Sequence, residues 1–175
     1  MRRLVYMACF CVLTVVTLAV PGARAPKDSA VLEKSYSTWK SVKRSCEDNY
    51  SYTVSTYGFT GIRNTTEVFV RRGKVVERRH IVFFQNGFAT MDWIENERNL
   101  NSHLEGAPAL TMDQLYQLAR KVLAVKIKDV WLRRQFAISP NGLLQSCYIY
   151  DTRIADDSDA AADGVDIDTL TLNPR

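Results

Sequence analysis

The stretch YSYTVSTY at residues 50–57 alternates large apolar side chains with small polar ones. A period of two is typical of a β-strand with one buried face. The residues before it follow a different period, because Val31, Leu32, Tyr36 and Trp39 recur at helical spacing. The change of period predicts a helix over residues 26–47, followed by a strand at 50–57.

Turn signals divide the next part of the chain into further strands. Gly58 and Gly61 end the first strand, and Arg72-Gly73-Lys74 and Asn86-Gly87 are typical hairpin turns. The pattern between them predicts strands at 66–71 and 75–84, and a fourth that runs from the Asn86-Gly87 turn through Trp93.

A second helix and a second group of strands follow. Thr111 is a predicted N-cap before an apolar stripe that begins at Leu115, and strands are predicted at 129–138, 143–150 and 165–172. The last is expected to be one edge strand, preceded by an acidic loop at 155–164. The order helix-strands-helix-strands predicts an α+β fold in which two amphipathic helices pack on antiparallel sheet.

The first 25 residues have the layout of a secretory signal peptide. Arg2 and Arg3 precede an uncharged apolar run over residues 4–20, and Ala23-Arg24-Ala25 fits the Ala-x-Ala pattern of a cleavage site. An uncleaved membrane anchor is the alternative, although the run is short for a span. We expect a leader at 1–25 and one secreted, extracellular domain at 26–175 with no membrane association after cleavage.

The charge of the chain changes when the leader is removed. The whole sequence has 23 basic and 19 acidic residues. The leader holds three arginines and no acid, which leaves 20 basic against 19 acidic residues and a net charge of +1. A secreted chain with so little net charge is not expected to bind nucleic acid.

Two cysteines, Cys46 and Cys147, remain after the leader. An even number in an oxidising compartment favours one disulfide between them, and two separate buried thiols are the alternative. The sequons at Asn49 and Asn64 predict glycosylation if the source is a eukaryote, with Asn64 the favoured site.

Two clusters of charge are candidate binding sites. One is the basic turn 71–79, which would bind a polyanion through Arg71, Arg72, Lys74, Arg78 and Arg79. The other is the acidic segment 151–168, where calcium is the one metal cofactor that the sequence suggests, with Asp156, Asp157 and Asp159 as its ligands. The alternative for both clusters is a solvated surface.

Catalytic motifs are not recognisable in the sequence, so we predict that the protein is not an enzyme. The predicted function is that of a secreted, non-enzymatic protein that binds a protein partner or forms part of the extracellular matrix. The alternative is a matrix protein associated with polyanion, mineral or calcium through the two charged clusters.

Several short motifs resemble an uncharacterised family of small secreted domains and lipoproteins. The residues that carry this resemblance are Trp39 in the first helix, Tyr50-x-Tyr52, Gly73-Lys74-Val75-Val76, Thr111-Met112-Asp113-Gln114-Leu115, and Gly142-Leu143 through Tyr148-Ile149-Tyr150-Asp151 to Asp156-Asp157. The resemblance implies an α+β domain with a fold like that of the β-lactamase inhibitor protein, and it supplies no catalytic residues. The sequence lacks the lipid-attachment cysteine of the bacterial members.

Overall fold

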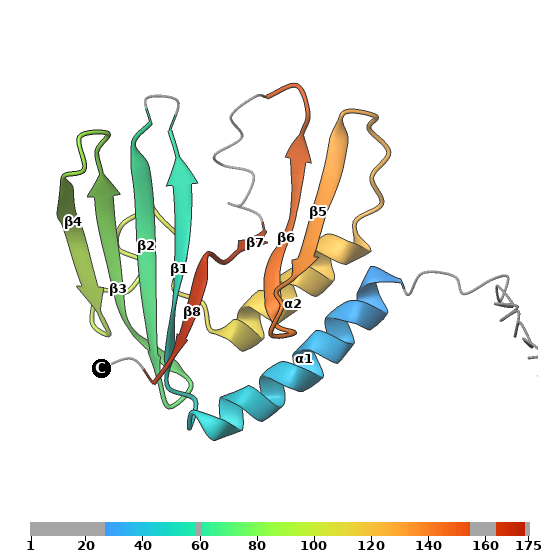
Figure 1. Cartoon of the computed structure of the whole chain (residues 1–175), viewed down its shortest axis with the longest axis horizontal. Coiled ribbons are helices and arrows are strands. Elements are labelled where there is room, and N and C mark those ends of the chain that lie inside the picture. Colours follow the sequence, from blue (N-terminus) through green and yellow to red (C-terminus); the bar gives the residue numbers. More distant parts are fainter. Residues whose placement is uncertain (1–26, 59–60, 155–163, 174–175) are drawn as a thin grey trace, which may run out of the picture.

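Two antiparallel sheets and two helices make up the fold (Figure 1), which confirms the predicted α+β class. The structure is a computed structural model and describes residues 27–58, 61–154 and 164–173. The predicted leader and most of the acidic loop lie outside these residues. No helix within the described ranges is long and apolar enough to cross a bilayer.

The larger sheet has the strand order β4-β3-β2-β1-β8. Its strands are β1 (Tyr50–Tyr57), β2 (Arg63–Arg71), β3 (Lys74–Phe83), β4 (Ala89–Asn96) and β8 (Thr169–Leu172). The turn between β2 and β3 places Arg72 at φ 50° and Gly73 at φ 75°, as a hairpin turn with two left-handed central residues requires. This sheet is therefore built mainly from hairpins whose turns the sequence predicted.

The smaller sheet has the order β5-β6-β7, from β5 (Leu132–Ile138), β6 (Leu144–Asp151) and β7 (Val165–Asp166). The single edge strand predicted at 165–172 is wrong, because the chain passes from one sheet to the other inside it. Ile167 donates its backbone N–H to the Gln145 carbonyl of β6, and Asp168 donates its backbone N–H to the Thr53 carbonyl of β1. Residues before this crossing pair with β6, and those after it pair with β1 (Figure 1).

Helices α1 (Asp28–Ser45) and α2 (Met112–Ala124) contact each other, and both contact the smaller sheet. Thr111 caps α2 in a reciprocal capping box with Gln114. The core joins both helices to β1: Trp39 is fully buried and meets the Tyr50 ring edge-on at 5.0 Å, and the Tyr50 hydroxyl accepts the Met112 N–H.

Cys46 and Cys147 are free thiols in the structure, which differs from the predicted crosslink. Cys46 ends α1 and donates to the Lys43 carbonyl, whereas Cys147 lies on β6 and faces the Ala119 carbonyl of α2. Both are buried, so each thiol behaves as a small core side chain on a different element.

Candidate functional site

The inner face of the larger sheet carries an unusual number of polar side chains. Strand register places Arg78 opposite Glu95, His80 opposite Trp93, and Thr66 opposite His80. Thr66, Arg78, His80 and Glu95 are all at least 95% buried. Buried polar groups need partners, and here the partners come from the sheet itself and from the chain segment that joins β4 to α2.

A β-bulge in β4 brings two consecutive residues to this inner face. The register shifts between His80 and Ile81, where Trp93 and Met91 are the successive partners and Asp92 is left over. Trp93 stacks on His80, and the Asp92 carboxylate lies 3.2 Å from His80 Nδ1. Without the extra residue, Asp92 and Trp93 would point to opposite faces.

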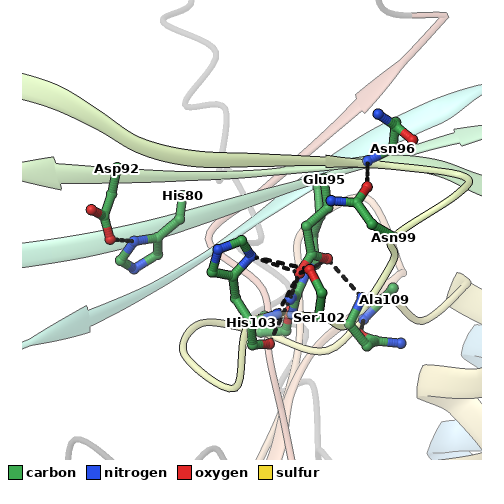
Figure 2. A network of polar contacts seen from close by, with 11 residues as sticks. His80, Asp92, Glu95, Asn96, Asn99, Ser102, His103 and Ala109 are labelled. Atoms are coloured by element: carbon green, nitrogen blue, oxygen red, sulfur yellow. Dashed lines mark hydrogen bonds and ion pairs between the residues drawn. The ribbon is translucent and has the colours of Figure 1, made fainter.

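Glu95 is the centre of a buried network (Figure 2). Arg78 donates to its carboxylate from Nε at 2.8 Å and Nη2 at 2.9 Å, a two-pronged ion pair. The same carboxylate accepts the backbone N–H groups of Asn101 and His103, both at 2.7 Å, and the Ser102 hydroxyl at 3.1 Å. The network therefore ties residues 101–103 to the sheet.

The charge of Glu95 is stabilised by these donors. Burial by itself raises the pKa of a carboxyl group, but the hydrogen bonds from Arg78, His103 and Asn101 outweigh burial and hold the pKa of Glu95 well below its ordinary value. Arg78 also donates to the carbonyls of His103 and Ala107. A buried anion and a buried cation thus anchor the same loop.

Gly106 lets this loop lie directly on the sheet. It has φ +78°, and a Cβ there would collide with the Thr66 hydroxyl and approach the rings of His80 and Trp93. The next residue, Ala107, donates its N–H to Thr66 Oγ1 at 3.0 Å. His103 completes the contact by stacking on Trp93 at 4.6 Å, so that both imidazole rings stack on the indole.

A pocket of about 480 Å³ lies between this loop, the larger sheet and β7. The sheet contributes Tyr52, Val54, Thr56, Asn64, His80, Val82 and Asp92. The other walls come from residues 104–108, Leu115 of α2 and residues 164–167. The volume falls within the range of small-molecule sites, roughly 300–1,000 Å³.

The described lining of the pocket is acidic. Asp92, Glu105 and Asp166 carry carboxylates, His80 is the one basic side chain in that lining, and neither Lys nor Arg is present. Within the part of the chain that the structure describes, no hydrogen bond or ion pair reaches the Asp166 carboxylate. Burial, with the nearby charge of Asp168, raises the pKa of Asp166.

This arrangement is suited to binding a cation with an apolar body. Val54, Val82 and Leu115 supply apolar wall, and the carboxylates supply negative potential in a concave, partly desolvated space. The Tyr52 hydroxyl is already engaged, because it donates to the Leu110 carbonyl at 2.7 Å. The described lining contains no Ser or Cys side chain that the His80–Asp92 pair would activate as a nucleophile.

The predicted polyanion site is divided by the structure. Arg78 is only 1% exposed and is ion-paired inside the protein, so its assignment to a surface cluster is wrong. Arg79 points to the other face of the sheet, where it pairs with Glu77 and covers the Phe69 ring. Arg72 and Lys74 are exposed at the turn, and Arg71 beside them is half-buried.

The two sequons lie in different environments. Asn49 accepts the Arg72 N–H through its side-chain oxygen and so supports the basic turn. Asn64 lies on β2 and lines the pocket, with its side chain partly exposed. Glycosylation at either asparagine stays a prediction, and a glycan on Asn64 would begin at the pocket wall.

The predicted calcium ligands Asp156, Asp157 and Asp159 lie outside the described residues. Within the described ranges, no group of three or more His, Cys, Asp or Glu side chains is arranged to hold a metal ion. Calcium binding therefore stays a prediction.

The pocket residues were missed by sequence reasoning, although one signal was present. Arg78, His80 and Val82 stand at every second position of a predicted strand. Their side chains therefore share one face of the sheet, although two are polar and one is apolar. A buried Arg needs an acidic partner, and Asp92 and Glu95, which follow the Asn86-Gly87 turn, were candidates.

Comparisons with known proteins found no matching family model, no matching curated protein and no matching solved structure. The resemblance to an uncharacterised secreted family, and to the fold of the β-lactamase inhibitor protein, stays a prediction.

Proposed function

We propose that this protein is a secreted, non-enzymatic binding protein whose pocket holds a small organic cation, such as an amine with an apolar body. One observation carries the proposal: the described lining has three carboxylates and no Lys or Arg to neutralise them. A ligand cation would supply the missing charge.

Asp166 is the main partner that we assign to the cation. It is half-buried, faces the pocket and lacks a hydrogen-bond partner among the described residues. Keeping such a carboxylate ionised is unfavourable until a cation arrives. An ammonium group would then form a charge-assisted hydrogen bond, which is stronger than a neutral one.

The His80–Asp92 pair is expected to orient the ligand. The Asp92 side chain is 54% exposed and keeps its second oxygen available, while His80 is packed against Trp93. The apolar walls would take the body of the ligand, and the pocket is large enough for a ring with a short chain.

The wider role that we propose for the protein rests on the sequence analysis. Export rests on the predicted leader at residues 1–25, and the expectation of a protein or matrix partner stays open beside the pocket ligand. The alternative of a polyanion-, mineral- or calcium-associated matrix protein would now depend on Arg71, Arg72 and Lys74 without Arg78, and on the acidic segment 151–168.

The test is calorimetric titration with a matched set of arylalkyl ligands that differ only in a terminal amine, alcohol or carboxylate. We expect the amine to bind and the carboxylate not to bind. Asp166→Asn should weaken amine binding about 10–100-fold, which corresponds to one charged hydrogen bond. Glu97→Gln is the control, since it removes the same charge from an exposed position outside the lining. Equal binding of alcohol and amine, or an unchanged Asp166→Asn, would refute the proposal.

A further inference from the structure

A second surface, distant in the fold from the pocket, combines exposed apolar side chains with basic ones. It lies where the chain leaves α2 and enters β5, together with the end of β6. We call it the Trp131 surface, and it consists of Val125, Val130, Trp131 and Ile154, with Lys126, Lys128, Arg133 and Arg153 around them. Val130 is 70% exposed and Trp131 is 50% exposed.

The backbone of the Trp131 surface is fixed by hydrogen bonds. Trp131 donates its backbone N–H to Asp129 Oδ1 at 2.9 Å, and its carbonyl accepts the Thr152 backbone N–H at 2.9 Å. Arg134 donates to the Val125 carbonyl at 2.5 Å, and Arg133 donates to the Val130 carbonyl at 2.7 Å. The apolar side chains are therefore displayed by an ordered segment.

The charge of the Trp131 surface is positive. Its four basic side chains face two acids among the described residues, Asp129 and Asp151. Asp151 forms an ion pair with Arg153, whose guanidinium lies 5.8 Å from the centre of the Trp131 ring. Asp129 accepts the backbone N–H of Trp131 through its side chain. Lys126 and Lys128 are exposed and stand on either side of the partly buried Ile127.

We propose that the Trp131 surface docks the protein onto an anionic lipid bilayer. Trp is favoured at the boundary of water and hydrocarbon, because its ring is apolar and its N–H is polar. Lysines around it would reach anionic headgroups, and their aliphatic stems would rest on the membrane. A soluble polyanion would satisfy the charges alone and would leave Val130 and Trp131 in water.

Membrane docking differs from the expectation from the sequence, in which the mature chain has no membrane association. Attachment here is peripheral and involves a few side chains, not a spanning segment. It does not depend on the pocket, because β5 lies at the opposite edge of the smaller sheet from β7 (Figure 1).

The test is co-sedimentation of the purified protein with vesicles of phosphatidylcholine alone and with 30% phosphatidylserine, at about 0.1 M salt. We expect binding to the anionic vesicles and little to the neutral ones, with a blue shift of tryptophan emission. Trp131→Ala should weaken binding at least about tenfold, and Lys126→Gln and Lys128→Gln about fivefold each.

Matched variants control for exposed apolar area and for charge elsewhere. Phe88→Ala removes a 71% exposed ring at another turn, and Lys74→Gln removes an exposed cation from the basic turn. Both should bind vesicles like the unmodified protein. The proposal would be overturned by equal binding to the two vesicle types or by unchanged vesicle binding of Trp131→Ala. Equally large losses of binding in the two control variants, or retention on heparin without vesicle binding, would also overturn it.

Discussion

Replacing Glu95 by Gln tests whether the buried ion pair holds the loop that forms the pocket wall. The substitution keeps the size of the side chain but removes its charge, and it exchanges an acceptor oxygen for a donor nitrogen. Glu95 is 0% exposed and Arg78 is 1% exposed, so the guanidinium would remain buried without its counter-charge. The two backbone N–H groups of residues 101 and 103 would also compete for one good acceptor.

The expected cost is about 3–5 kcal/mol, the usual result of breaking a buried ion pair from one side. For a domain of this size each kcal/mol lowers the melting temperature by about 2–4 °C, so the midpoint should fall by about 6–20 °C. Differential scanning calorimetry and urea titration measure both quantities. Amine affinity should fall as well, since the loop holding Glu105 and Ala107 is released.

The pH dependence gives a second measure of the same interaction. The pKa of Glu95 is lower in the folded protein than its ordinary value of 4.5. Its charge therefore stabilises the fold above about pH 4.5, and this contribution is lost as the pH falls from there toward the folded pKa. The stability of Glu95→Gln should change less over that acidic range than the stability of the unmodified protein.

A double variant separates charge from packing. Arg78→Met with Glu95→Leu removes both charges, so it should recover only the part of the lost stability that comes from leaving the Arg78 charge unpaired. It should stay less stable than the unmodified protein, because the backbone N–H groups of residues 101 and 103 also lose their acceptor. If the free energy of unfolding of Glu95→Gln lies within about 1 kcal/mol of that of the unmodified protein, the network does not anchor the loop and the reasoning fails.

Three further predictions concern the pocket and the core. Asp166→Asn should raise stability at neutral pH, because the raised pKa of Asp166 means that its ionised form is disfavoured in the fold; a stability loss in urea titration would contradict this. Gly106→Ala should lower stability clearly more than Gly87→Ala. Both residues have positive φ, so each substitution adds about 1–2 kcal/mol of backbone strain, but only a Cβ at residue 106 would collide with Thr66. Equal melting temperatures of the two variants would argue against a tight loop contact. Burial raises the pKa of Cys147 to about 11, so a thiol reagent should react with it at neutral pH only in denaturant. The intact mass of the protein should not change on reduction, and one disulfide found in the exported protein would show that this thiol is paired.

Periodicity was enough to predict most of the elements. The helical stripe around Trp39 and the predicted N-cap at Thr111 correspond to α1 and α2, and the turns at Gly73 and Gly87 lie between the expected strands. These signals are local, because a cap, a turn or an amphipathic stripe is decided by residues a few positions apart.

The parts that sequence reasoning missed depend on contacts between distant residues. β2 begins at Arg63, earlier than predicted, since the polar Asn64 and Thr65 gave no apolar pattern and are held by pairing with β1. The bulge at Asp92 depends on how β4 aligns with β3, and no turn residue marks it. The pocket also needs residues 164–167 beside residues 104–108, a distance along the chain over which local patterns say nothing.

The crossing at Ile167 has a consequence for how the protein matures. Both sheets depend on residues 165–172 for an outer strand, and these residues leave the ribosome after all the other strands. Hairpins β2–β3 and β5–β6 can pair as soon as they emerge, because their partners are adjacent in the chain. Until residues 165–172 are made, each sheet lacks one of its outer strands, and the pocket lacks the wall that residues 164–167 contribute.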